Sequence, residues 1–406
     1  MDDDQRQGGP KPPVETILTH GGRMAEDCFG FVNAPVFRGS TILFKTLDEL
    51  EDYGAPYRYG RNDNPTGRAL ASIVTELEGA SGTVLAPSGL SAISTALLAV
   101  LAAGDEVLVT DSVYEPTRLF CSETLARFGV TRRYYDPRIG AGIAGLLTEK
   151  TRAVFVESPG SLTFEVQDLP AIAAAAKARG VAVVVDNSWA TPLFYRPLAL
   201  GADIVVHSGT KMFVGHSDAM FGTISANEAY WPRLARTHRR LGVAVSPDDS
   251  FLAARGLRTL AVRMKEHEAR ARALAGWLEG QPAVRRVFHP ALPGHPDHAI
   301  WKRDFTGSGS VFAVLLEPAP RVAVAAMVDD FRLFGMGYSW GGFESLCLPV
   351  HPEKIRTAVP WTEAGNLLRI HVGFEDLGDL EADLAAGLER YRAANPWFSP
   401  GAEATA

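Results

Sequence analysis

The sequence has few cysteines. Cys28, Cys121 and Cys347 are the only ones in 406 residues, and no two of them form a CxxC pair. A sparse and odd set of this kind cannot supply a disulfide framework, and it is typical of proteins in a reducing compartment. We therefore expect a cytoplasmic protein whose fold is stabilised by a buried core rather than by cross-links.

Long apolar runs and basic clusters are also missing. No segment approaches the roughly 20 apolar residues that a membrane helix requires. The first 13 residues, MDDDQRQGGPKPP, lack the basic and apolar regions of a signal peptide. Lys and Arg number 40 against 47 Asp and Glu, a net charge of −7 that argues against a nucleic-acid partner. We expect no membrane association, and a disordered tail over residues 1–13.

The apolar content is sufficient for a large core, because 46% of the residues are hydrophobic and 21% are charged. The length corresponds to about two domains. We divide the chain into an N-terminal tail and arm (1–65), a large α/β domain (66–255) and a smaller α+β domain (256–406). Residues 34–44 of the arm are strand-like, and residues 257–279 form a long helical pattern.

Short apolar runs alternate with helix-like segments in the large domain. Continuous Val- and Ile-rich runs separated by helices predict a mostly parallel sheet that helices cover on both faces. The predicted strands are EVLVTDS (106–112), AVFVESP (153–159), VAVVVDN (181–187), DIVVHSG (203–209) and FGTISA (221–226).

Polar residues follow several of these strands, where open α/β sheets bind ligands. Lys211 follows one strand in a Ser-Gly-Thr-Lys turn, and a lysine in a low-dielectric site loses its proton and attacks carbonyl groups. Asp186 ends the preceding strand and could hold the protonated ring nitrogen of pyridoxal phosphate. Taken alone, Lys211 could be an exposed lysine that follows a strand, and Asp186 could be an aspartate that caps a helix or turn. The pair is more specific than either residue.

A phosphate site is indicated at residues 87–90, Pro-Ser-Gly-Leu, which open a helix-like segment. A serine cap followed by glycine brings free backbone N–H groups and the positive helix end to one point. Ser208 and Thr210 could add hydroxyl donors, and Tyr114 could stack on a cofactor ring. The structural alternatives are a simple helix cap at Ser88 and a packed aromatic residue at Tyr114.

Other cofactor patterns are weaker. The GxxxxGK[ST] motif does not occur, and HEARA at residue 267 lacks the second histidine of a zinc-protease helix. His289, His295 and His298 lie in a Pro- and Gly-containing stretch, and we assign no metal site to them.

Eight motifs carry a resemblance to a known family: YGRNDNPT (59–66), PSGLSAI (87–93), DSVYEPT (111–117), ESPGSLTFEVQD (157–168), DNSWATP (186–192), SGTKMFVGHSDAMFG (208–222), GYSWGGFESL (337–346) and LLRIHVGFED (367–376). Over about residues 14–395 the chain resembles the Cys/Met-metabolism branch of the fold-type I pyridoxal-phosphate (PLP) enzymes. The resemblance implies PLP as cofactor. It also implies a mostly parallel seven-stranded sheet in the large domain and a smaller α+β C-terminal domain.

The resemblance implies roles for the residues around the cofactor. Lys211 would carry PLP as a Schiff base, Asp186 would pair with its ring nitrogen, and Tyr114 would stack over the ring. The residues that would hold its phosphate are Gly89, Leu90, Ser208 and Thr210.

The same resemblance implies an active site shared between subunits. Tyr59 and Arg61 match a tyrosine and an arginine that complete the phosphate site of a neighbouring subunit, which implies a dimer within a homotetramer. Arg369 matches the arginine that grips the α-carboxylate of an amino-acid substrate, a bidentate task suited to guanidinium.

One segment separates the branches of the family. Tyr338-Ser339-Trp340 stands where γ-acting members have Ser-Leu before Gly-Gly, and these three residues are assigned to substrate binding. This form implies a carbon–sulfur β-lyase that converts L-cystathionine, or a related S-substituted cysteine or cystine, to a thiol such as homocysteine, pyruvate and ammonia. Lys211 would remove the α-proton, and Lys211 or Tyr114 would protonate the sulfur. The alternatives are a γ-acting relative and a PLP-binding regulatory protein without activity.

Overall fold

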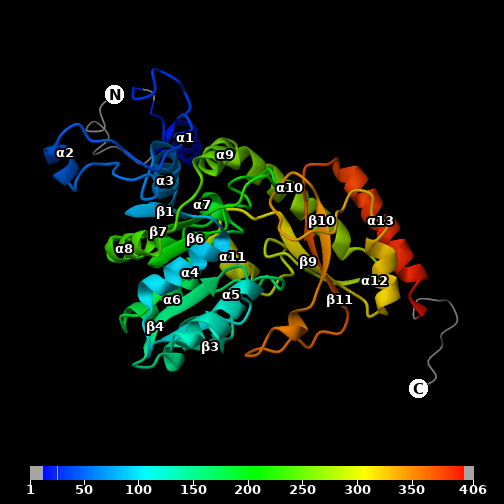
Figure 1. Cartoon of the computed structure of the whole chain (residues 1–406). Coiled ribbons are helices and arrows are strands. Elements are labelled where there is room, and N and C mark those ends of the chain that lie inside the picture. Colours follow the sequence, from blue (N-terminus) through cyan, green and yellow to red (C-terminus); the bar gives the residue numbers. More distant parts are fainter. Residues whose placement is uncertain (1–11, 25, 397–406) are drawn as a thin grey trace.

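The structure is a computed structural model that describes residues 12–24 and 26–396. The predicted disordered tail, residues 1–13, therefore lies outside the described residues except at its last two positions. Figure 1 shows the N-terminal arm at one end of the molecule, the large sheet in the middle and the C-terminal helices at the other end.

A seven-stranded sheet forms the centre of the large domain, with the strand order β1-β7-β6-β5-β4-β2-β3. Strand β7 runs antiparallel to both of its neighbours, and the other pairs are parallel. The predicted mostly parallel sheet is confirmed. Its strands are β1 (Gly82–Ala86), β2 (Glu106–Thr110), β3 (Thr131–Tyr135), β4 (Thr151–Glu157), β5 (Ala182–Asp186), β6 (Ile204–His207) and β7 (Gly222–Ala226).

Apolar side chains cover both faces of this sheet. Along β4, Val154 and Val156 belong to one buried cluster, whereas Ala153 and Phe155 belong to another on the opposite face. Helix α6 (Leu169–Lys177) contributes to the first cluster and α4 (Gly89–Val100) to the second. Because both faces are buried, the strands have continuous apolar sequences instead of alternating ones.

A second sheet, entirely antiparallel, forms the C-terminal part with the order β10-β11-β9-β8. Helices α10, α12 and α13 pack on one of its faces (Figure 1). These elements are β8 (Val284–Phe288), β9 (Val311–Leu316), β10 (Leu346–Val350), β11 (Asn366–His371), α10 (Leu260–Glu279), α12 (Arg321–Val328) and α13 (Leu377–Ala393). The remaining α-helices of the described residues are α1 (Val14–His20), α2 (Leu47–Glu51), α3 (Pro65–Glu78), α5 (Glu115–Leu119), α7 (Thr191–Phe194), α8 (Trp231–Leu241), α9 (Pro247–Arg258) and α11 (His298–Asp304).

Two local predictions are wrong. The helix expected over 257–279 is interrupted at Thr259, whose backbone (φ −107°, ψ 8°) is not helical, so α9 ends at Arg258 and α10 begins at Leu260. The Thr259 side chain accepts a hydrogen bond from Arg263 Nε at 3.1 Å, which favours this break. The strand-like stretch 34–44 forms only a single bridge, between Thr41 and Tyr59, because no neighbouring strand is available to it.

A buried ionic network joins the C-terminal part to the large sheet. Asp111, directly after β2, accepts hydrogen bonds from the backbone N–H groups of Thr357, Ala358 and Val359 and from the Arg118 guanidinium. Burial opposes ionisation, but these donors hold the pKa of Asp111 below its ordinary value. The segment that links β10 to β11 is thereby fixed to the end of β2. The domain division at residue 255 stays a prediction, since α9 spans it.

Candidate active site

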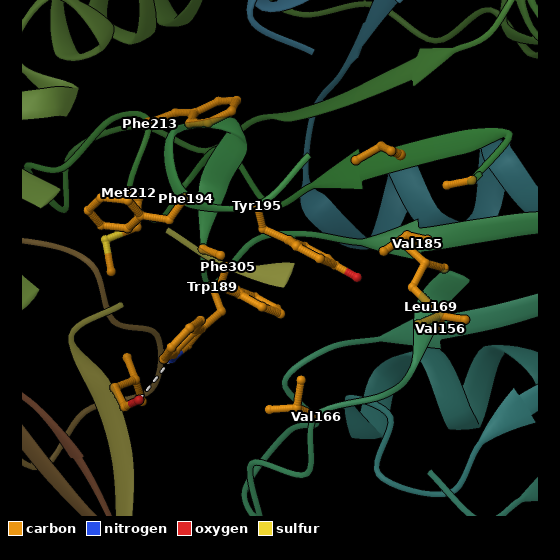
Figure 2. Close-up of a cluster of buried hydrophobic side chains, with 14 of the residues drawn as sticks. Val156, Val166, Leu169, Val185, Trp189, Phe194, Tyr195, Met212, Phe213 and Phe305 are labelled. Atoms are coloured by element: carbon orange, nitrogen blue, oxygen red, sulfur yellow. Dashed lines mark hydrogen bonds between the residues drawn. The ribbon is translucent and has the colours of Figure 1, made fainter. Parts of the chain in front are cut away.

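A cavity of about 400 Å³ opens at the carboxyl ends of β4, β5 and β6. Its walls come from these strand ends, the start of α4, and the segment 338–340. Trp189 also lines the cavity, and Figure 2 shows its ring at the edge of the buried aromatic cluster. Its Nε1 donates a hydrogen bond to the Val311 carbonyl at 2.8 Å. The wall is rigid because Trp189 packs edge-on against Phe305, which stacks on Tyr195 at 4.0 Å between ring centres.

Lys211 extends into this cavity from the turn after β6. Its Nζ donates a hydrogen bond to Ser339 Oγ at 2.5 Å and lies 5.4 Å from the centre of the Trp340 ring. Burial lowers the pKa of Lys211 to about 8, and the nearby Arg369 charge acts in the same direction. About a tenth of this amine is therefore neutral at pH 7, far more than for an ordinary lysine, and the neutral form is the one that a nucleophile or general base requires.

Two carboxyl groups lie side by side at the ends of β4 and β5. Glu157 and Asp186 are register partners in adjacent parallel strands, and both line the cavity. Burial raises the pKa of both groups, and that of Glu157, which also feels the Asp186 charge, lies well above its ordinary value. Asp186 accepts hydrogen bonds from the Ser188 N–H and hydroxyl at 2.9 and 2.6 Å, and Glu157 accepts the Tyr114 N–H at 2.8 Å.

The N-terminus of α4 forms an anion cradle. Ser88 caps the helix by accepting the Ser91 N–H at 3.1 Å, and the N–H groups of Gly89 and Leu90 in the first turn have no partner within the helix. A Cβ atom added to Gly89 would lie 2.5 Å from the Ser208 Cβ, so only glycine permits this approach. Thr210 lines the same wall, and its hydroxyl also contacts the Phe221 backbone.

The C-terminal part supplies the opposite wall. Arg369 in β11 donates from Nη2 to the Ser339 carbonyl oxygen at 3.0 Å. Ser339 has φ +81°, an unusual conformation for a residue with a side chain, and it turns both its carbonyl and its hydroxyl toward cavity residues. Tyr338 also lines the cavity and is 93% exposed at its mouth.

The structure brings most of the predicted site residues to this one cavity, but not all. The residues that line it are Gly89, Leu90, Tyr114, Asp186, Ser208, Thr210, Lys211, Tyr338, Ser339, Trp340 and Arg369. Tyr59 and Arg61 do not line it. Arg61 instead lines a separate hollow beside α8, and its Nη1 donates to the Arg239 carbonyl at 3.3 Å.

From the sequence, Glu157 belongs with the polar residues at the strand ends but receives no specific role, and Ser188, which directly follows the predicted strand 181–187, is not singled out. The view that the sequence contains no GxGxxG pattern of dinucleotide sites is wrong, because Gly140–Gly145 matches it. That stretch lies within a short 3₁₀ helix, Gly140–Leu146, away from the cavity, so it lacks the strand–turn–helix context that the pattern requires. Within residues 12–24 and 26–396, no group of three or more His, Cys, Asp and Glu side chains is arranged to hold a metal ion.

Comparison with known proteins decides the family. The profile described as Cys/Met metabolism PLP-dependent enzyme matches residues 15–389. The chain belongs to this family. The predicted family, fold class and PLP cofactor are confirmed. No helix in the described part of the chain is long and apolar enough to cross a membrane.

Relatives in this family differ in their reactions. Cystathionine beta-lyase MetC of Escherichia coli is 41% identical over 389 residues, which cover 93% of this chain and 98% of that protein. L-alanine/L-glutamate racemase of Wolbachia pipientis is 37% identical over 392 residues, covering 93% and 97%. A crystal structure of cystathionine gamma synthase from Xanthomonas oryzae, in complex with aminoacrylate and cysteine, has a TM-score of 0.87 and 33% identity, covering 95% of this chain and 100% of that chain.

The cavity fits PLP at each end. The α4 cradle with Ser208 and Thr210 supplies donors for a phosphate, Asp186 supplies a carboxylate for a protonated ring nitrogen, and Lys211 supplies the amine for the aldehyde. The close approach of Gly89 to Ser208 keeps the cradle free of side-chain atoms on one side.

The pKa of Lys211 predicts how the cofactor-free protein captures PLP. Only the neutral amine attacks the aldehyde, so the capture rate constant is expected to rise about tenfold per pH unit below pH 8 and to level off above it. An ordinary lysine, with a pKa of about 10.4, would keep gaining rate up to pH 10. Stopped-flow absorbance with added PLP measures this profile, and a rate that still climbs steeply beyond pH 9 would contradict it.

Proposed function

We propose that the protein is a carbon–sulfur β-lyase that converts L-cystathionine, or a related S-substituted cysteine or cystine, to a thiol, pyruvate and ammonia. The observation that carries the proposal is the convergence of Lys211 and Arg369 on Ser339, through its hydroxyl and its carbonyl. A substrate whose α-carboxylate is held by Arg369 would bring its α-carbon next to the lysine amine. The relative from Escherichia coli supports the choice of cystathionine.

The cofactor supplies an electron sink that stabilises negative charge at the substrate α-carbon. Lys211 acts as the base that removes the α-proton, since its lowered pKa makes the neutral amine far more available than in an ordinary lysine. Asp186 keeps the ring nitrogen protonated, and the α4 cradle anchors the phosphate. Arg369, with Ser339, Trp340 and Tyr338 around it, orients the substrate.

The departing sulfur needs a proton, and two residues can supply it. Burial raises the pKa of Tyr114, as do the nearby charges of Glu157 and Asp186, so its phenol remains protonated and able to donate. Lys211 holds the α-proton after the first step and can pass it on. The Cβ–S bond then breaks, and hydrolysis of the three-carbon fragment gives pyruvate and ammonia.

Product analysis tests the proposal against its γ-acting alternative, to which the Xanthomonas structure gives weight. Purified, PLP-loaded protein with L-cystathionine is expected to give homocysteine and pyruvate in equal amounts. A γ-acting enzyme would give cysteine and 2-oxobutyrate, and that result would overturn the proposal. A parallel incubation with L-alanine, followed by chiral chromatography, measures racemisation, the reaction in which the same base returns the proton to either face. Racemisation in the absence of pyruvate formation would also overturn it.

The proposal includes a dimer in which Tyr59 and Arg61 reach the phosphate end of a neighbouring subunit, within a homotetramer. Its support is that neither residue lines the cavity of its own chain, and that the arm exposes large apolar side chains. Phe29, Leu43 and Tyr53 are 97%, 89% and 87% exposed, which is costly unless a partner covers them. A cytoplasmic location belongs to the proposal as well, because all three cysteines are buried free thiols.

A further inference from the structure

A buried histidine holds the turn that follows the substrate-binding segment. His371 is the last residue of β11, and its side chain is fully buried. Its Nε2 lies 3.1 Å from the Gly341 backbone nitrogen and 3.2 Å from the Gly342 carbonyl oxygen. Its Nδ1 lies 2.8 Å from Ser310 Oγ, just before β9. One imidazole ring therefore connects two strands of the small sheet to this turn.

The protonation of the ring follows from its surroundings. Burial holds the pKa of His371 well below its ordinary value, and the nearby His267 acts in the same direction, so the ring is neutral. A neutral imidazole has one N–H group and one acceptor nitrogen. The Gly341 N–H donates to Nε2, so Nδ1 carries the proton and donates it to Ser310 Oγ. The Gly341 N–H, which can only donate, thus sets the tautomer, and the Ser310 hydroxyl accepts the proton on the other nitrogen.

The position of Gly341 matters for the reacting groups. Gly341 has φ +90°, and a Cβ atom added to it would lie 2.9 Å from the Lys211 carbonyl carbon, so the turn packs directly on the lysine backbone. Two residues earlier, Ser339 is held at φ +81° with its carbonyl oxygen bound to Arg369. A non-glycine residue in this region of φ is strained, and the conformation persists only if neighbouring contacts enforce it.

Other contacts hold only the later part of this segment. The Phe343 carbonyl accepts the Phe374 N–H at 2.8 Å, and Ser345 Oγ donates to Glu375 at 2.7 Å. These contacts begin four residues beyond Ser339, whereas the His371 contacts begin two residues beyond it. His371 is therefore the nearest of these tethers on the C-terminal side of the strained residue.

We propose that His371 is a positioning residue: its Nε2 fixes the Gly341 turn so that the Ser339 carbonyl keeps the Arg369 guanidinium aimed at the substrate carboxylate. The kinetic part of this inference rests on the proposed function, because it assumes that Arg369 binds the α-carboxylate. The structural part does not, since the Gly341 N–H contact exists without substrate.

Two substitutions of similar polarity distinguish the contact made by Nε2 of His371 from the contact made by Nδ1. The amide of His371→Gln lies near the position of Nε2 and can still accept the Gly341 N–H, whereas that of His371→Asn lies near Nδ1 and can reach only Ser310. In His371→Asn we expect KM for L-cystathionine to rise about tenfold and kcat to change less than threefold. Without the tether the turn can shift, and the Ser339 carbonyl, as part of the backbone, cannot rotate on its own to restore its hydrogen bond with Arg369. In His371→Gln we expect both constants to stay within about threefold of the unsubstituted enzyme.

Hydrogen exchange of peptides covering residues 336–345, measured by mass spectrometry on PLP-loaded protein without substrate, provides a readout independent of the reaction. Faster exchange is expected in His371→Asn and unchanged exchange in His371→Gln. Equal kinetics and equal exchange in the two variants would overturn the proposal. If the kinetic split is absent while the exchange split is present, the carboxylate role of Arg369 is wrong and the tether is retained.

Ser310→Ala is a second route to the same answer, should His371→Asn fail to fold. It removes the hydroxyl that accepts the Nδ1 proton, so the ring loses the contact that holds its Nε2 toward the Gly341 N–H. A rise in KM of about threefold and faster exchange over 336–345 are expected. Unchanged values of both would overturn the proposal.

Discussion

Lys211→Ala is expected to lower kcat for pyruvate formation by at least about 10⁴-fold and to prevent covalent attachment of PLP. The substitution removes the amine that attacks the cofactor aldehyde and the base that takes the α-proton, so two functions are lost together. Absorbance of the PLP-loaded protein and mass spectrometry after borohydride reduction measure the attachment. A coupled lactate dehydrogenase assay measures pyruvate.

Lys265→Ala is the matched control. Lys265 is an exposed lysine paired with Glu15 at 2.8 Å, far from the cavity, and its loss is expected to change neither readout. Turnover near the normal value in Lys211→Ala would reject the assignment of Lys211. A protein that retains PLP and a binding partner but shows no turnover even when unsubstituted would instead favour the regulatory alternative.

The same variant tests the shared active site. When Lys211→Ala chains are mixed with Arg61→Ala chains and allowed to exchange, each mixed dimer contains one site with an intact lysine and an intact partner arginine. About one quarter of the normal activity is expected to return after random exchange. No recovery, with subunit exchange confirmed by native mass spectrometry, would argue that Arg61 acts within its own chain.

The parts of the fold and site that depend on local sequence could be predicted. Buried Val-rich strands and the polar residues that follow them led to Lys211 and Asp186, because the carboxyl ends of parallel strands meet at one edge. The break at Thr259 could not be predicted from periodicity, since the apolar spacing continues through it. Strand β3, Thr-Arg-Arg-Tyr-Tyr, was missed because an edge strand is half exposed and lacks a continuous apolar run.

Contacts between distant segments were beyond sequence reasoning. Glu157 is a strand-end candidate from the sequence, but its position beside Asp186 follows only from the register of the two strands. Likewise, His371 reads as one more residue of a buried strand until β9 and the 341–342 turn are placed around it. Tyr59 and Arg61 show the opposite case, because their assignment came from the resemblance, and one chain alone does not bring them to the cavity.

Asp186→Asn is expected to lower kcat by about 10³-fold, because an amide has no charge with which to keep the cofactor ring nitrogen protonated. Glu157→Gln is the matched control. It makes the same chemical change on the adjacent strand, and its amide oxygen can still accept the Tyr114 N–H, so a loss of no more than about tenfold in kcat is expected. Equal losses in the two variants would show that the two carboxylates act as a unit.

Asp186→Asn, which lowers kcat, is expected to raise the stability of the cofactor-free protein. The pKa values of Asp186 and Glu157 are raised in the folded protein, so the folded state retains protons that the unfolded chain has already lost. These groups therefore destabilise the cofactor-free protein progressively as pH rises above their unfolded values of about 4. At pH 8, Asp186→Asn should raise the free energy of unfolding, and this gain should vanish near pH 4. Urea denaturation of the cofactor-free proteins at both pH values measures the difference.

A stabilisation confined to high pH, in a variant that has lost its turnover, would identify Asp186 as a charge buried for catalysis at the expense of the fold. Equal stability of variant and unsubstituted protein at pH 8 would contradict this.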